Sequence, residues 1–239
     1  MQRLGHTCSS RQRDHLLLTP DTFIRAPLPG MQRATAVVHV SPAMGAGFTQ
    51  YTAEFEAGGV LAATGKQRFV YVIEGELTVG DRRLATGEYC YTSTAHAASL
   101  AASVASRVAV IEKVYKPLEK TPPCLLTGRE SEIEPKPLMG DNALEVRTLL
   151  PDDFAFDFAV NTMTFQPGAA LPMVEIHVME HGLLMLEGGG IYRLGNSWYP
   201  VTAGDFIWMA PYCPQWFGAL GKVPTKYLIY KDWNRHPLE

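Results

Sequence analysis

Two stretches of this chain share a series of landmarks in the same order, and this internal repeat constrains the fold more than any other feature. In each stretch an apolar run ends in Glu-Gly, at Glu74-Gly75 and at Glu187-Gly188. A glycine, an acidic residue and an aromatic residue then follow, at Gly87-Glu88-Tyr89 and at Gly204-Asp205-Phe206. A β-rich chain can produce one such match by chance, but several landmarks in one order favour a duplicated domain.

Short runs rich in Val, Ile, Thr, Tyr and Phe lie between glycines and prolines, of which the chain holds 21 and 17, and long helical periodicity is absent. Gly80-Asp81 and Gly195-Asn196 each separate two β-rich runs, where a tight turn needs residues that tolerate positive φ. Short strands with frequent turn signals are typical of an all-β sandwich or barrel. The clearest runs are Phe69–Ile73, Val108–Val114, Gly190–Leu194 and Lys226–Tyr230.

A proline-rich stretch interrupts the pattern at about residues 116–142. Proline fixes φ and removes a ladder donor, so this stretch is not expected to form a central strand. We expect it to wrap the surface, with one short helical turn near Ser131.

At roughly 150 residues per domain, 239 residues leave one large domain or two compact ones. The repeat predicts barrels over residues 1–120 and 146–239, joined by a linker over residues 121–145.

Composition excludes several classes of protein. Apolar residues make up 46% and charged residues 19%, which is enough for a sizeable core and argues against disorder. The formal charge of −3 and the lack of a basic block predict no nucleic-acid and no membrane partner. The polar N-terminus and four widely scattered cysteines favour a cytoplasmic protein with reduced thiols.

Glu175, His177 and His181 lie within seven residues and form the strongest chemical signal. Residues two apart in a strand point to the same face, so Glu175 and His177 project together, and His181 joins them if the strand continues without a bulge. Two imidazoles and a carboxylate at one point can bind a divalent transition metal. The alternative is a polar strand edge that faces water. By the same strand phase, Glu180 is expected to face solvent.

The segment from Gly168 to Gly188 resembles the first cupin motif, with Glu175, His177 and His181 in its ligand positions. In the second cupin motif a ligand stands eleven residues after the first glycine, which from Gly204 is Gln215. The resemblance therefore implies the ligand set Glu175, His177, His181 and Gln215. Oxygen donors beside imidazoles suit Mn²⁺, with Fe²⁺, Ni²⁺ or Zn²⁺ as alternatives.

When the same motif spacing is applied to the first repeat, none of the positions holds a metal ligand. The corresponding positions are Ala62, Thr64, Arg68 and Ala98. We therefore expect one metal per chain and an N-terminal barrel without a metal site. A lone histidine nearby, His96, is expected to be a structural hydrogen-bonding residue.

The sequence around these ligands is more specific than the general cupin motif. The segments EIHVMEHG, GGGIYRLGNSWYPVTAGDFIWM, YCPQ and YLIYKDWNR resemble the (S)-ureidoglycine aminohydrolases, and the likeness extends over about residues 15–236. It implies a bicupin, which is two jelly-roll β-barrels in tandem. It also implies a Mn²⁺-dependent hydrolase of purine (allantoin) catabolism that releases ammonia from (S)-ureidoglycine to give (S)-ureidoglycolate.

The same resemblance implies that Tyr192, Tyr227 and Lys231 bind the substrate. Tyr227 and Lys231 share one strand face, and a lysine at a strand end can meet a substrate carboxylate. The structural alternatives are that Lys231 is a surface lysine and that the two tyrosines only pack in the core. The candidate catalytic residues are Glu175, as a proton shuttle, and Lys231, as an electrostatic anchor. Trp216, next to Gln215 but of opposite phase, is expected to pack behind the site.

Two other functions remain open. One is another metal-dependent cupin activity, such as an isomerase or dioxygenase that acts on a small keto acid or sugar. The other is a non-enzymatic, ligand-binding bicupin, against which the full ligand set argues. Because barrel sheets of this kind have open edges, we also expect a homo-oligomer.

Overall fold

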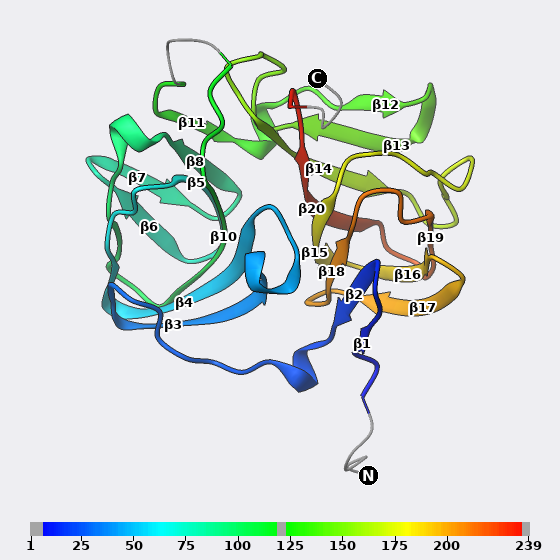
Figure 1. Cartoon of the computed structure of the whole chain (residues 1–239), viewed down its shortest axis with the longest axis horizontal. Coiled ribbons are helices and arrows are strands. Elements are labelled where there is room, and N and C mark those ends of the chain that lie inside the picture. The colour runs from blue at the N-terminus through cyan, green and yellow to red at the C-terminus, as the bar shows by residue number, and fades with distance from the viewer. Residues whose placement is uncertain (1–6, 119–122, 236–239) are drawn as a thin grey trace. The chain divides into compact units, whose positions relative to one another are not determined.

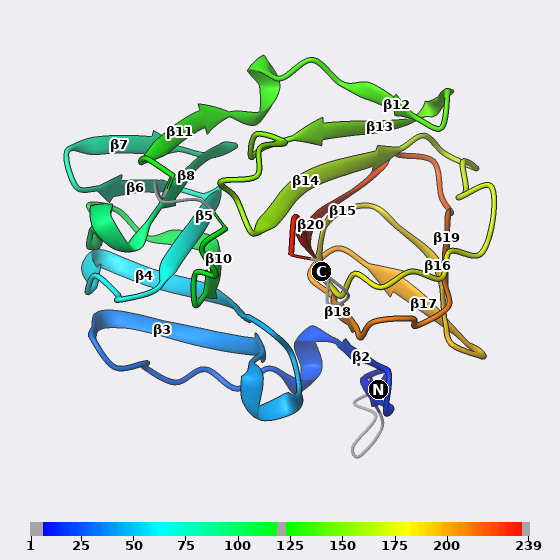
Figure 2. The same ribbon diagram turned by 45° about the horizontal axis from the view of Figure 1, so that its top comes forward.

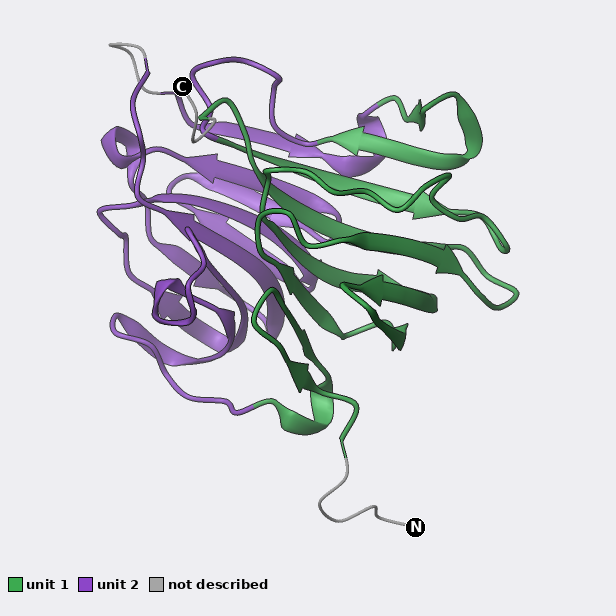
Figure 3. Ribbon diagram, turned by 45° about the vertical axis from the view of Figure 1, so that its right-hand side comes forward, with its two compact units in different colours: residues 1–23, 134–148, 158–239 green, residues 24–133, 149–157 purple. Residues whose placement is uncertain are grey.

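The computed structural model describes residues 7–118 and 123–235, and within them the chain forms twenty strands and four short 3-10 helices (Figure 1). It divides into two compact units, coloured in Figure 3. Unit 1 comprises residues 1–23, 134–148 and 158–239, and unit 2 comprises residues 24–133 and 149–157. Each unit is therefore built from separate segments, whereas the sequence predicted barrels that are continuous along the chain.

Unit 2 holds a single sheet of nine strands. In the order of the sheet the strands run β11-β8-β5-β10-β4-β9-β6-β7, with β3 also paired to β4. Its strands are β3 (Met31–Val40), β4 (Thr49–Leu61), β5 (Gln67–Glu74), β6 (Glu76–Val79), β7 (Arg82–Ala85), β8 (Glu88–Thr92), β9 (Leu100–Ala102), β10 (Ser106–Lys113) and β11 (Leu126–Arg129).

The apolar runs of unit 2 are buried on both faces of their sheet, which explains why they lack a clear alternation of apolar and polar residues. In β5, Val70 and Val72 belong to the core cluster of the unit. The intervening Phe69 points the other way and stacks on Tyr89 with ring centroids 5.7 Å apart.

Unit 1 holds two sheets, of eight and three strands. The eight-stranded sheet runs β1-β2-β18-β15-β20-β14-β13-β12 and the three-stranded sheet runs β17-β16-β19. The core cluster of the unit takes Leu183 and Met185 from the larger sheet and Leu194 and Phe217 from the smaller. The strands are β1 (Ser10–Arg11), β2 (His15–Leu18), β12 (Lys136–Leu138), β13 (Asp141–Thr148), β14 (Phe158–Phe165), β15 (His181–Glu187), β16 (Gly189–Leu194), β17 (Ser197–Thr202), β18 (Phe206–Met209), β19 (Gln215–Ala219) and β20 (Thr225–Asp232).

The two units use the same device at their repeated Glu-Gly landmark, which supports the internal repeat. Gly75 and Gly188 both have positive φ, 81° and 68°. A Cβ atom on either glycine would lie 2.5 Å from a hydroxyl oxygen, that of Ser106 in unit 2 and of Thr225 in unit 1. Each hydroxyl contacts the backbone N–H that follows the glycine, at 3.0 Å and 2.9 Å. Only glycine fits at both positions.

The proline-rich stretch supplies edge strands, as its loss of ladder donors predicts. β11 ends the sheet of unit 2, and β12 ends the larger sheet of unit 1, beside β13 and β14 (Figure 2). The helical turn expected near Ser131 is the 3-10 helix η4 (Glu130–Glu132). The other three are η1 (Pro20–Thr22), η2 (Pro42–Met44) and η3 (Thr94–His96).

The first strands of the chain join unit 1 rather than unit 2, because β2 pairs with β18 in an antiparallel ladder from Leu18↔Phe206 to His15↔Met209. The apolar run Leu16–Leu18 that the sequence shows near the N-terminus therefore covers the edge of the larger sheet. Across the described residues, no helix has the length and hydropathy that a membrane-spanning helix requires.

Candidate metal centre and active site

The segment that carries the candidate ligands crosses between the two sheets of unit 1. Glu175 makes an isolated bridge to Gln215 of the smaller sheet, with N–H···O distances of 2.8 and 3.0 Å in the two directions. His181 is the first residue of β15 in the larger sheet. Residues 176–180 form no strand, so the condition that a strand continues from Glu175 to His181 is not met. The ligand residues come together because the chain changes sheets, and not because of a period of two.

His177 and His181 meet with their Nε2 atoms 3.2 Å apart. The Nδ1–H of His181 donates to the Tyr230 carbonyl at 3.2 Å, which leaves a lone pair on Nε2. Burial, together with the nearby His177 and Lys231, holds the pKa of His181 well below its usual value. Two imidazoles whose Nε2 atoms converge, one of them held by a backbone carbonyl at Nδ1, fit a divalent transition metal.

Gln215 lies against the same pair, with its side-chain Nε2 2.8 Å from Nε2 of His177. Its oxygen Oε1 points the other way and accepts a hydrogen bond from the Tyr192 hydroxyl at 3.1 Å. The residue predicted as a fourth ligand is therefore in place, with the amide nitrogen rather than the oxygen turned toward the imidazoles.

Glu175 and the three predicted substrate-binding residues face the same cavity as the histidines and Gln215. The cavity has a volume of about 150 Å³. Burial, and the nearby Glu175 carboxylate, raise the pKa values of Tyr192 and Tyr227 above the ordinary phenol value, so both hydroxyls stay protonated. The cavity is lined by Leu138, Val146, Met163, Leu171, Glu175, His177, Met179, His181, Tyr192, Gln215, Tyr227, Ile229 and Lys231.

Lys231 brings a positive charge to this cavity. With the Asn161 amide oriented to satisfy both of its ends, Oδ1 accepts a hydrogen bond from the lysine Nζ at 3.1 Å. Nζ also lies 5.8 Å from the ring centroid of Trp233. Asn161 is a neighbour that the sequence did not reveal, since it lies seventy residues earlier on β14.

Strand phase predicted that Glu175 faces the site and that Glu180 faces solvent. Glu175 is half-buried in the cavity, but Glu175, His177 and His181 do not bring three ligand atoms within 4.8 Å of one another. Glu180, expected to face solvent, is instead buried, and its carboxylate accepts a hydrogen bond from Nε1 of Trp208 at 3.2 Å. Strand phase fails for Glu180 because the chain is irregular there.

A second group of possible ligands, Asp14, His15 and Cys213, has atoms within 4.8 Å of one another. The residues are far apart in the sequence, so no spacing signal could reveal them. Both ring nitrogens of His15 already have protein partners, Asp14 at Nδ1 and the Tyr199 hydroxyl at Nε2, each at 2.9 Å. The hydrogen bonds of His15 to Asp14 and Tyr199 account for this group. Trp216 does not line the cavity, and its Nε1 donates to the Leu171 carbonyl at 2.7 Å.

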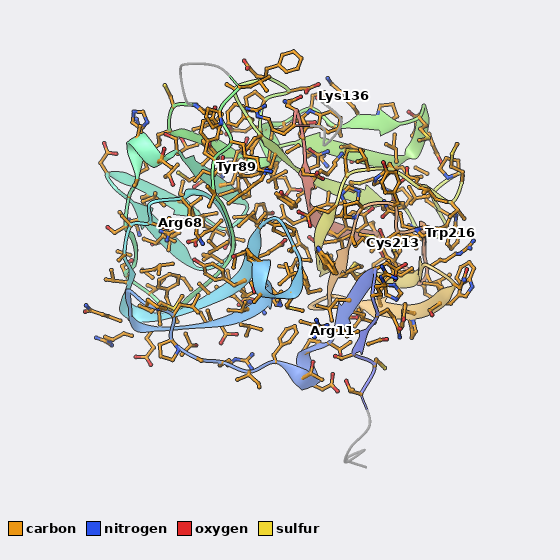
Figure 4. The ribbon with its side chains drawn as sticks, viewed as in Figure 1. Arg11, Arg68, Tyr89, Lys136, Cys213 and Trp216 are labelled. Carbon is orange, nitrogen blue, oxygen red and sulfur yellow. The ribbon has the colours of Figure 1, made fainter. Side chains whose placement is uncertain are left out.

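In unit 2 the guanidinium of Arg68, a residue labelled in Figure 4, contacts two of the positions that correspond to the candidate ligands. Arg68 stands in the position of His181, and its Nη1 donates to the carbonyls of Ala62 at 3.1 Å and Ala98 at 3.5 Å. Its Nε and Nη2 both lie 2.8 Å from one carboxylate oxygen of Glu112. Ala62 and Ala98 are the counterparts of Glu175 and Gln215. A fixed cation with its own counter-ion thus fills the equivalent place. His96 contacts the Ser93 hydroxyl through Nδ1 at 3.1 Å.

Two β-barrel units related by an internal repeat, with a histidine cluster inside one of them, define a two-barrel cupin, and residues 161–230 match the family model described as a cupin domain. The chain is 39% identical to the (S)-ureidoglycine aminohydrolase of Arabidopsis thaliana, over 98% of this chain and 80% of that protein. It is 31% identical to the (S)-ureidoglycine aminohydrolase of Escherichia coli (strain K12), over 92% and 88%. It therefore belongs to the (S)-ureidoglycine aminohydrolase family.

A solved structure of a Pseudomonas aeruginosa protein described as glyoxylate-induced has the same fold. It superposes with a TM-score of 0.86 at 27% identity, over 99% of this chain and 94% of that one.

Proposed function

We propose that this protein hydrolyses (S)-ureidoglycine to (S)-ureidoglycolate and ammonia, as a divalent-metal enzyme of purine catabolism that uses Mn²⁺. The likeness to named aminohydrolases over nearly the whole chain supports the reaction. The observation that carries the proposal is the single cavity that gathers the imidazole pair, Gln215, two protonated phenols and Lys231. At about 150 Å³ it suits a small metabolite, since drug-sized ligand sites measure roughly 300–1,000 Å³.

The residues of the cavity divide the work as follows. His177 and His181 through Nε2, Gln215 through Oε1 and Glu175 through its carboxylate would hold the metal. When bound, such an ion supplies Lewis acidity and a fixed charge that orients the substrate. Lys231 anchors the substrate carboxylate by a charge-assisted contact. Glu175 offers a carboxylate oxygen that can take a proton from the attacking water and pass it to the leaving amine.

The test is to generate ureidoglycine enzymatically from allantoate and to follow ammonia release and the chirality of the product with Mn²⁺-supplemented protein. We expect acceleration over spontaneous decay and a single enantiomer of ureidoglycolate. Absence of any acceleration would overturn the assignment and return the choice to another cupin activity or a binding protein. Acceleration with a racemic product would keep the reaction class and discard the anchored substrate.

Lys231→Met is expected to lower kcat/KM about ten- to a hundredfold and to leave the metal content unchanged. A charge-assisted contact to a carboxylate contributes roughly 1.5–3 kcal/mol, which gives this range. The matched control is Lys226→Met on the same strand, because Lys226 pairs with Glu187 at 2.7 Å and does not line the cavity. Steady-state kinetics and elemental analysis measure both variants, and full activity of Lys231→Met would remove the lysine from the site.

We further propose a cytoplasmic homo-oligomer that acts on a small molecule without nucleic-acid or membrane partners. The four cysteines are all free thiols, which suits a reducing compartment. β7 is an edge strand of the sheet of unit 2 and offers a ladder to a second copy. Light scattering at micromolar concentration is expected to give a mass above that of one chain, and a strict monomer would exclude the oligomer.

A further inference from the structure

Tyr192 and Gln215 form a buried pair inside the cavity. Their side chains are 1% and 3% exposed. The strands pair Tyr192 with Phe217 and Leu194 with Gln215. Tyr192 and Gln215 are therefore diagonal neighbours on one face of the smaller sheet, at a separation that long side chains span. The hydroxyl of Tyr192 and Oε1 of Gln215 are 3.1 Å apart.

The two ends of the Gln215 amide have different partners, and only one end can serve a cation. Nε2 faces His177 at 2.8 Å, and Oε1 faces Tyr192. An amide nitrogen has no lone pair to offer a metal, whereas the oxygen has two. A cation held by the imidazoles therefore favours the amide turned by half a revolution. That turn is accessible because the terminal torsion of glutamine is soft and roughly two-fold.

The phenol of Tyr192 can bond to either end of this amide. It is neutral, so its hydroxyl donates to Oε1 in the orientation shown, and its oxygen can accept from Nε2–H in the opposite one. We propose that Tyr192 is the positioning residue of Gln215, and that metal binding turns the amide so that Oε1 faces the imidazoles and Nε2 donates to the Tyr192 oxygen. This inference rests on the metal centre of the proposed function.

The turn changes what Tyr192 offers to a ligand. In the orientation shown, the hydroxyl proton is engaged by Oε1. After the turn the oxygen accepts from Gln215, and the hydroxyl proton is released toward the cavity. Tyr192 thereby becomes a hydrogen-bond donor to an acceptor atom of a bound ligand, such as a carboxylate or carbonyl oxygen, only once the metal is in place. The order of binding is then metal first and substrate second.

A measurement of metal affinity distinguishes the positioning role of Tyr192 from a direct contact with the substrate. Full-length Tyr192→Phe, stripped by chelation and titrated with Mn²⁺ in a calorimeter, is expected to bind about ten- to a hundredfold more weakly than the parent, as for other groups that orient a metal ligand. Tyr227→Phe is the matched control, because Tyr227 is equally buried in the same cavity and its hydroxyl is not the one bonded to Gln215. Its Mn²⁺ affinity is expected to equal that of the parent. Thermal melting of both stripped variants identifies any loss of affinity that comes from misfolding.

The turn itself is read by proton NMR of the Gln215 side-chain amide, with diamagnetic Zn²⁺ as the ion. The amide protons are expected to show cross-relaxation with the His177 ring before Zn²⁺ is added and with the Tyr192 ring afterwards. Unchanged Mn²⁺ affinity in Tyr192→Phe overturns the positioning role, and amide contacts that stay at His177 overturn the turn. Weaker metal binding in a protein that releases no ammonia would keep this inference and discard the proposed reaction. A parent protein that binds no divalent cation overturns both the metal centre and this inference.

Discussion

His181→Ala is expected to remove stoichiometric metal from the purified protein and to lower kcat/KM by about three orders of magnitude. A bound ion of this kind contributes several kcal/mol to the transition state, and about 4 kcal/mol corresponds to a thousandfold. The parent is expected to carry one metal per chain, because Ala62, Thr64 and Ala98 of unit 2 offer no imidazole, thiolate or carboxylate and Arg68 fills the equivalent place. Elemental analysis and steady-state kinetics give the two readouts.

The control for this variant is His96→Ala, which removes an imidazole from an exposed turn of unit 2. It is expected to leave both metal content and rate unchanged. Two metals per chain in the parent would contradict the interpretation of unit 2. A parent-like metal content in His181→Ala would place the ion elsewhere, and the Asp14–His15–Cys213 group would be the first place to examine.

Arg68→Met is expected to destabilise unit 2 by about 3–5 kcal/mol. The substitution leaves the Glu112 carboxylate, whose side chain is 13% exposed, without its cation, and an unpaired buried charge costs that much. Urea unfolding followed by far-UV circular dichroism measures the loss. Tryptophan fluorescence would not report on unit 2, because all four tryptophans lie in the second half of the chain.

An exposed ion pair in the same sheet provides the comparison. Arg107 and Glu74 lie 2.7 Å apart, with side chains 43% and 66% exposed, so Arg107→Met is expected to cost about 0–1 kcal/mol. Equal losses in the two variants would show that Arg68 contributes only as a surface charge does. The double variant Arg68→Met/Glu112→Leu is expected to recover part of the stability, because it removes the orphaned carboxylate as well.

Much of the architecture could be predicted from the sequence because it depends on local signals. Glycines with positive φ lie in the turns between strands that the sequence predicted. Gly80 and Gly195, with φ of 60° and 58°, lie in two hairpin turns. The pairing of β2 with β18 could not be predicted, since it joins segments almost two hundred residues apart through backbone hydrogen bonds that leave no mark on composition. The division of the chain into units differs from a simple cut at the linker for the same reason.

The sequence placed the candidate site residues near one another but did not predict the geometry by which they meet. Spacing and resemblance named seven residues, and all seven line one cavity. The period of two did not account for how they meet, because residues 176–180 leave one sheet and enter the other, and this crossing buries Glu180. Asn161 was missed because an isolated asparagine in a β-rich run has no spacing relation to Lys231.

The guanidinium of Arg68 makes the charge at the centre of unit 2 a covalent part of the polypeptide. An ion that exchanges with solvent stabilises a fold only to the extent that its free concentration exceeds its dissociation constant. Arg68 has no such dependence, because a tethered guanidinium cannot be diluted, chelated or replaced by a competing ion. The ion pair of Arg68 with Glu112 thus stabilises unit 2 independently of any supply of dissolved ions.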